Sequence, residues 1–143
     1  MVDAHLNRFV EAQESLFMDV LAELNAEQKT GHWMWFIFPQ IKGLGKSAYS
    51  DMYGIADSSE ALAYLHHELL GLRLKAVVSI LLHAKEANPE VIFGRTDAMK
   101  LRSSLTLFSS VDASEEQPFK KCLDKFFFGM PDEKTLALLS QQN

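Results

Sequence analysis

Apolar side chains recur every three or four positions along most of the chain, which is the pattern of helices that bury one face. The first such stripe runs from Phe9 to Leu24, and Gln13 and Ser15 mark a point where this helix can kink or break. No segment shows the sustained alternation that a half-buried strand requires. The pattern therefore predicts an all-α fold, a single multihelical domain over residues 1–143 with about six to eight helices.

Polar residues with capping chemistry divide this pattern into separate helices. Ser47 predicts a helix over 48–53, and Asp57 predicts the start of the next. Residues 68–87 are apolar nearly all round, which is typical of a central, mostly buried helix. Residues 115–128 predict another helix, and three further helices are predicted to begin at caps formed by Asn88, Thr96 and Asp132.

The segment from His32 to Gln40, here called the aromatic block, holds both tryptophans and two of the ten phenylalanines. Left in water, so much aromatic surface would drive aggregation, so the block must be held in one environment. We interpret it as a short buried helix closed by Pro39 rather than an extended piece, because the other strong segments are helical. The block marks the region where a site is expected.

Composition narrows the class of protein. The chain has 143 residues, 48% of them hydrophobic and 23% charged, as in soluble globular proteins. A net charge of −5 argues against general nucleic-acid binding. The single Cys122 cannot form an internal disulfide, which favours a reducing cytoplasm. We expect no signal peptide and no membrane span, and the absence of paired metal-ligand motifs predicts neither a metal nor a cofactor.

Arg73 is the most informative single residue for function. A helix advances roughly 100° per residue, which places Arg73 about 120° from the centre of the polar stripe of its helix. His66 lies on the same side if the helix is continuous there. An arginine that faces protein needs a carboxylate, carbonyls or a bound anion. Three interpretations stay open: an ion pair with a residue such as Glu60 or Asp97, an anion site, and extension to solvent.

The helix predicted to begin at Thr96 is a second candidate region. Asp97 and Lys100 share one of its faces, and Arg102 lies on another. Five hydroxyl residues between 103 and 110 lower its helix propensity. They either bond back to the carbonyls of the preceding turn or join the lysine and arginine in a phosphate site.

Two further features are His32, the first residue of the aromatic block, and the loop that follows the block. His32 is either a general base or a base-stacking partner, or a histidine at the edge of the core that bonds a carbonyl. The loop Lys42–Ser47 holds two glycines but lacks the spacing of a phosphate-binding loop, so it predicts a tight turn before a helix cap. Its Lys46 adds positive charge beside the block.

The aromatic block and the segment Lys100–Phe108, with the sequence KLRSSLTLF, are similar to a family of small bacterial proteins of unknown function. Its members are sometimes labelled calpastatin. The resemblance covers nearly the whole chain. It implies a single all-helical domain and a cytoplasmic protein, and it implies no established activity, cofactor or catalytic residue.

Two functions remain open from the sequence. One is a pocket that binds an anionic small molecule, a nucleotide or a phosphorylated metabolite, and whether it is also an enzyme stays open. The other is a non-enzymatic interaction or regulatory module, with homo-oligomers among its partners. The candidate ligand-binding residues are Trp33, Trp35, Gln40, Lys46, Arg73, Lys100 and Arg102, and the candidate catalytic residues are His32, His66 and Asp97.

Overall fold

The computed structural model describes the backbone of residues 2–142 and the side chains of residues 5–142. Within this part of the chain there are ten helices and one isolated bridge, between Ile41 and Ile55. The helices are α1 (Val2–Glu14), α2 (Phe17–Asn25), α3 (Met34–Ile37), α4 (Ala48–Tyr53), α5 (Ser58–His66), α6 (Leu70–His83), α7 (Pro89–Phe93), α8 (Arg95–Ser109), α9 (Pro118–Phe127) and α10 (Glu133–Gln141). The all-α prediction is confirmed, and the predicted count of helices was slightly low.

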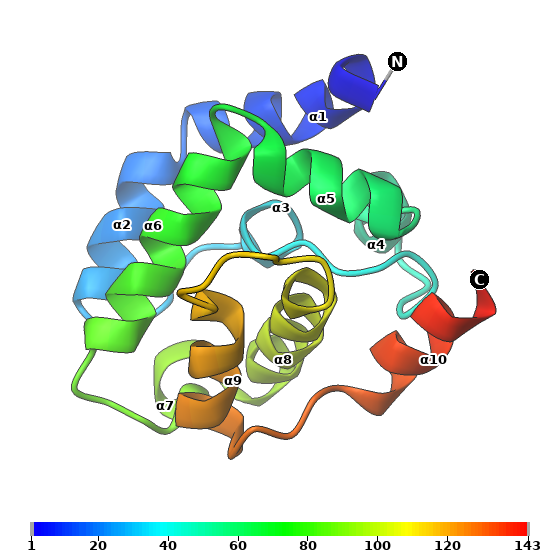
Figure 1. Cartoon of the computed structure of the whole chain (residues 1–143). Helices are drawn as coiled ribbons and strands as arrows, with labels where there is room; N and C mark the ends of the chain where they lie inside the picture. Colours follow the sequence, from blue (N-terminus) through cyan, green and yellow to red (C-terminus); the bar gives the residue numbers. More distant parts are fainter. Residues whose placement is uncertain (1, 143) are drawn as a thin grey trace.

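The centre of the fold is α8 (Figure 1), which packs against α3, α5, α7, α9 and α10. Its middle turns are almost entirely buried, including Leu101, Leu105 and Phe108. The sequence assigned the central position to residues 68–87 instead. That helix is shorter, as α6, and it buries only one face, since Leu72 is 68% exposed. Apolar composition alone does not decide which helix is surrounded on all sides.

The chain turns sharply between α5 and α6 (Figure 1), so the helix is not continuous from His66 to Arg73. The ring nitrogen Nδ1 of His67 accepts hydrogen bonds from the backbone N–H groups of Leu69 and Leu70 and so caps the start of α6. The two helices approach closely at Gly71. The geometric premise that placed His66 beside Arg73 is therefore wrong.

Most predicted caps are confirmed. Each of four side chains accepts a hydrogen bond from a backbone N–H in the first turn of its helix: Ser47, Asp57, Asn88 and Asp132. Thr96 is not a cap, because α8 begins one residue earlier, at Arg95 after Gly94. The N-terminal stripe breaks near Ser15, at the predicted point, into α1 and α2.

The aromatic block forms the short helix α3, as predicted. Trp33, Phe36 and Phe38 are buried, so the block is mostly part of the core. Trp35 differs from Trp33 because it is half-buried, so part of its ring is accessible to a ligand. No helix in the described residues is long and apolar enough to cross a membrane.

Candidate functional site

A pocket of about 250 Å³ lies between the aromatic block, α4, and the N-terminal ends of α8 and α10. Figure 1 shows α4 and α10 on the same side of the molecule, to the right of α8. Among the residues predicted for a site, Trp35, Gln40 and Lys100 line this pocket. Trp35 and Gln40 belong to the aromatic block and Lys100 to α8, and the packing of α3 on α8 brings the two segments together.

One wall of the pocket is aromatic and consists of Trp35, Tyr49 and Tyr53. The Ser47 cap starts α4, and the two tyrosines, four residues apart, lie on one face of it. The Trp35 and Tyr49 rings are stacked, with centroids 4.9 Å apart and planes 25° apart. The Tyr49 and Tyr53 rings are nearly parallel, at 9°, with centroids 6.4 Å apart. The three rings form a continuous aromatic surface, here called the aromatic wall.

Lys100 lies against this wall. Its ammonium nitrogen lies 4.2 Å from the centre of the Trp35 ring, in cation–π contact. It is also 3.4 Å from Oδ1 of Asp97, whose Oδ2 is 2.8 Å from Nζ of Lys29. The Lys29 side chain is 6% exposed and the Lys100 side chain 23%. Two lysines therefore share one carboxylate, and the more accessible of them lines the pocket.

The remaining lining is polar. Gln40 and Lys134 contribute to it, and the hydroxyl of Ser103 donates to a carbonyl of its own helix. Asp132 caps α10, because its Oδ2 accepts from the backbone N–H and the hydroxyl of Thr135, at 2.9 and 2.6 Å. The pocket thus combines an aromatic wall, two lysines and several hydrogen-bonding groups, which are the elements of a small-molecule site.

Arg102 does not line the pocket but holds one side of it in place. Its guanidinium donates from Nε to the carbonyl of Met130, at 2.8 Å, and from Nη2 to the carbonyl of Pro131, at 3.0 Å. The hydroxyl of Thr106 accepts from the backbone N–H of Asp132 at 2.8 Å. These bonds fix the segment before α10 on α8 and so position the polar side of the pocket.

Arg73 lies outside the pocket. Its Nη1 donates to Oε1 of Gln13 at 3.2 Å, and its Nη2 is 3.6 Å from Oε2 of Glu14. It forms an ion pair, but not with either of the partners suggested from the sequence, Glu60 and Asp97. Arg73 stabilises the junction of α1 and α6, and the structure does not bring it to the aromatic wall.

Four other candidates are also placed away from the pocket lining. His32, His66 and Lys46 are exposed and do not line it. Trp33 is 1% exposed and belongs to the core, with its Nε1 donating to Oε1 of Glu23 at 3.0 Å. The two tryptophans of the block therefore have different environments.

Glu23 organises the turn that leads into the aromatic block. One carboxylate oxygen accepts from the backbone N–H of Thr30 and of Gly31 and from the Trp33 indole. Burial opposes ionisation of this group, but the hydrogen bonds from Gly31, Thr30 and Trp33 outweigh it and lower the pKa of the Glu23 carboxyl below its ordinary 4.5. A Cβ on Gly31 would lie 2.8 Å from Cδ1 of Trp33, so glycine is needed at this turn.

Most hydroxyl groups between residues 103 and 110 bond back to carbonyls of the preceding turn, which was one of the two interpretations of this segment. Ser103, Thr106, Ser109 and Ser110 each donate to a backbone carbonyl three or four residues earlier. Ser104 is buried with no hydrogen-bond partner for its hydroxyl among the described residues. Four of the five hydroxyls are therefore satisfied by their own helix, and the five do not gather into a phosphate site.

Sequence reasoning missed most of the pocket lining, including Tyr49, Tyr53, Asp132 and Lys134. The two tyrosines carried a usable signal, since their spacing of four in a capped helix places them on one face. Nothing local indicates that α10 returns to α8, so Asp132 and Lys134 could not be found. Within the described residues, no three histidine, cysteine, aspartate or glutamate side chains gather where they could hold a metal ion.

Fold and pocket together define a class: a small all-helical protein with an open pocket that combines aromatic and cationic side chains. The chain belongs to the family described as protein of unknown function DUF1810, whose model matches residues 3–139. This confirms the family resemblance found in the sequence, while nothing in these comparisons supports the calpastatin label.

A solved structure shares this fold. The chain is similar to the conserved hypothetical protein Rv1873 from Mycobacterium tuberculosis, whose crystal structure was determined at 1.38 Å. The two are 44% identical, with a TM-score of 0.91, and the match covers 94% of this chain and 96% of the other. A comparison with curated proteins finds no match. These relatives establish the family and the fold, and neither description assigns an activity.

Proposed function

We propose that this protein binds an anionic small molecule, a nucleotide or a phosphorylated metabolite, in the pocket beside the aromatic block. The observation that supports this most strongly is the position of Lys100. Its ammonium group lines the pocket and lies over Trp35, and it shares its only ion-pair partner among the described residues, Asp97, with Lys29. The charged side chains that line the pocket are Lys100, Lys134 and Asp132, with a net charge of +1, and an anion would neutralise it.

The second argument comes from the aromatic wall. Trp35 already has Tyr49 stacked on it and Lys100 in contact with its ring. Tyr49 is 55% exposed, so its surface is available to a flat ligand. Stacking on an aromatic side chain contributes roughly 1–3 kcal/mol per base in nucleic-acid complexes. The tyrosines of α4, rather than the indoles, are therefore the proposed stacking surface.

We propose a binding role rather than a catalytic one. His32 and His66 do not line the pocket, and both carboxylate oxygens of Asp97 are paired with lysines. A general base has to reach the proton that it removes. The pocket lining offers no histidine for that task. The single buried Cys122 is compatible with a cytoplasmic location, which we also propose.

A thermal-shift experiment tests the proposal. The probes are inorganic phosphate, ribose 5-phosphate and the four nucleoside monophosphates. A ligand at about 100 times its Kd stabilises a protein by roughly 2.7 kcal/mol, which corresponds to a rise in Tm of about 5–10 °C for a domain of this size. At least one probe is expected to give such a rise with the wild type.

Variants locate the binding to the pocket. Lys100→Met keeps the apolar stem over Trp35 and leaves Asp97 paired with Lys29, so it is expected to fold and to lose the ligand-induced rise. Lys121→Met, at an exposed position on α9, is the matched control and is expected to keep it. The proposal is refuted if none of these probes shifts the wild-type Tm, or if the shift persists in Lys100→Met.

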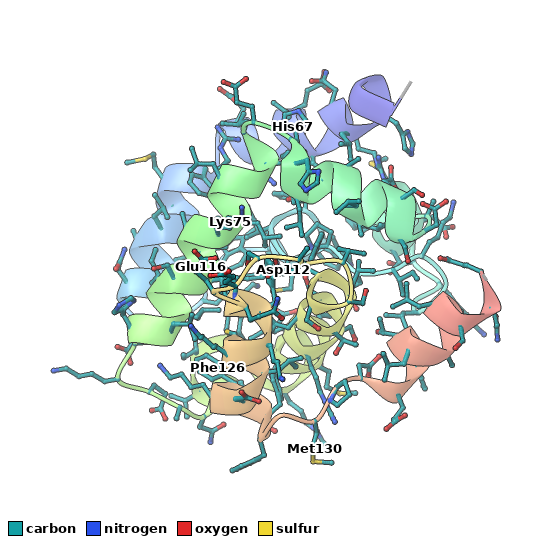
Figure 2. The ribbon with its side chains drawn as sticks, viewed as in Figure 1. His67, Lys75, Asp112, Glu116, Phe126 and Met130 are labelled. Carbon is teal, nitrogen blue, oxygen red and sulfur yellow. The ribbon has the colours of Figure 1, made fainter. Side chains whose placement is uncertain are left out.

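One observation favours the alternative function, an interaction module. Phe128 is 91% exposed and Met130 is 59% exposed, and the two lie two positions apart in the segment just after α9. Figure 2 shows Met130 at the lower edge of the molecule. Exposed aromatic residues with apolar neighbours occur at protein interfaces. We propose self-association through these residues as this second candidate. Sedimentation equilibrium tests it: an oligomer that dissociates on Phe128→Ser supports it, and a monomeric wild type excludes it.

A further inference from the structure

The backbone that follows Gln40 along the pocket lining is fixed on both sides of Ile41. The carbonyl of Gln40 accepts from the N–H of Ile55 at 2.8 Å, and the N–H of Lys42 donates to the carbonyl of Ile55 at 2.8 Å. These bonds form the isolated bridge between Ile41 and Ile55, both of which are buried. The position from which the Gln40 side chain leaves the backbone is therefore held firmly, on the pocket lining.

The Gln40 side chain itself has no hydrogen-bond partner among the side chains and backbone groups that the structure describes. Gln13, in contrast, uses both ends of its amide within the protein. The Gln40 amide lines the open pocket and keeps contact with solvent, unlike Oγ of Ser104 and Oδ2 of Asp112, which are enclosed and unpaired within the described part of the chain. Water can satisfy its donors and acceptors, and a ligand that enters the pocket can take the place of that water. Gln40 therefore has its full capacity of donors and acceptors available to a ligand.

The chemistry of the amide selects the ligand. A glutamine amide presents a donor and an acceptor side by side in one plane, which matches the edge of a nucleobase that carries an acceptor beside a donor. The aromatic wall lines the same pocket and suits the flat face of such a base. A sugar phosphate offers neither a flat face nor a paired edge, so it would use Lys100 alone.

From this we infer that the ligand is a nucleoside monophosphate whose base edge is bound by Gln40 and whose base stacks on the aromatic wall, with its phosphate at Lys100. The inference rests on the function proposed above and narrows it. The volume of about 250 Å³ is small for a binding pocket, which favours a mononucleotide over a dinucleotide.

Isothermal titration calorimetry with AMP, GMP, CMP, UMP and ribose 5-phosphate tests the inference. At least one nucleotide is expected to bind tenfold or more tightly than ribose 5-phosphate, since a paired contact to a base edge contributes on the order of a tenfold change in affinity. Gln40→Met, which keeps the side-chain length and removes the amide, is expected to weaken nucleotide binding about tenfold and to leave ribose 5-phosphate binding unchanged.

The control is Gln28→Met, at an exposed position in the loop after α2, which should leave every affinity unchanged. Equal affinity of the wild type for ribose 5-phosphate and for all four nucleotides would overturn the inference, even if Gln40→Met failed to fold. A nucleotide preference that survives in folded Gln40→Met would overturn it as well. Such results would leave the proposed anion site standing, whereas failure of every probe to bind would refute the site itself.

Discussion

Replacing Gln13 by leucine should destabilise the protein strongly, because Gln13 connects α1 to the aromatic block and to α6. The side chain is 1% exposed. Its Nε2 donates to the carbonyl of Phe36 at 2.7 Å and to the hydroxyl of Tyr64 at 3.0 Å, and its Oε1 accepts from Arg73 at 3.2 Å. Burial raises the pKa of Tyr64 far above its ordinary 10.0, so its buried hydroxyl stays neutral.

The magnitude follows from what leucine would leave unpaired. The carbonyl of Phe36 and the hydroxyl of Tyr64 would each lose a hydrogen bond inside the core, at about 1–3 kcal/mol for each group. The Arg73 side chain is 16% exposed, so its guanidinium can bond to water instead. Leucine recovers part of the loss by burying apolar surface, so we expect a net destabilisation of about 2–4 kcal/mol.

Urea denaturation followed by circular dichroism measures this change, and the expected fall in Tm is roughly 5–15 °C. Gln28→Leu, an exposed glutamine, is the control and should change the free energy of unfolding by less than about 0.5 kcal/mol. A destabilisation below about 1 kcal/mol for Gln13→Leu would refute the reasoning, because it would mean that these buried groups find other partners without cost.

Three further predictions concern packing and stability elsewhere in the fold. Gly71→Ala should destabilise the protein by about 3 kcal/mol, because the added Cβ would lie 2.0 Å from the carbonyl oxygen of Leu65. Urea denaturation measures this change, and an unchanged midpoint would contradict the close approach of α5 and α6. Burial raises the pKa of the Cys122 thiol to about 12, so DTNB at about pH 8 should label the unfolded but not the folded protein. The lowered pKa of Glu23 stabilises the fold above pH 4.5, and this contribution is lost as the pH falls through the folded-state pKa. Stability measured across this range should therefore depend less on pH in Glu23→Gln, and an identical profile would contradict the assignment.

Helix starts could be predicted from the sequence because a cap is a local interaction. Ser47 and Asp132 bond to backbone N–H groups three residues away, and nothing elsewhere in the fold has to be known. Thr96 shows the limit of this reasoning. It has the right chemistry for a cap, but Gly94, with φ at +81°, already ends α7 and begins α8. A second possible cap two residues later then falls inside the helix.

The partner of a buried charge could not be predicted in the same way. Periodicity correctly indicated that Arg73 turns toward protein, since its side chain is only 16% exposed. The atoms that it contacts belong to Gln13 and Glu14, about sixty positions away in the sequence. Which residues lie opposite a helix face depends on how α1 packs, and the sequence pattern contains no information on that packing.

The two tryptophans illustrate the same limit inside the site. Trp33 and Trp35 are two residues apart and were predicted together, yet one is buried and bonded to Glu23 while the other lines the pocket. Helix α3 has only four residues, too few for a periodic pattern to separate an inner from an outer face. Their difference arises from α4, which supplies Tyr49 as the neighbour of Trp35.

Lys100 and Arg102 show how the fold divides two cations that the sequence treated alike. Two positions on a helix are about 200° apart, so both cannot face the same pocket. Arg102 has a planar group with five donors, and the fold uses it to bind two backbone carbonyls. Lys100 has a compact ammonium group that acts as a point charge and lines the pocket. In the proposed site Lys100 would therefore supply charge and impose little geometry, so discrimination among anions would have to come from Gln40 and the aromatic wall.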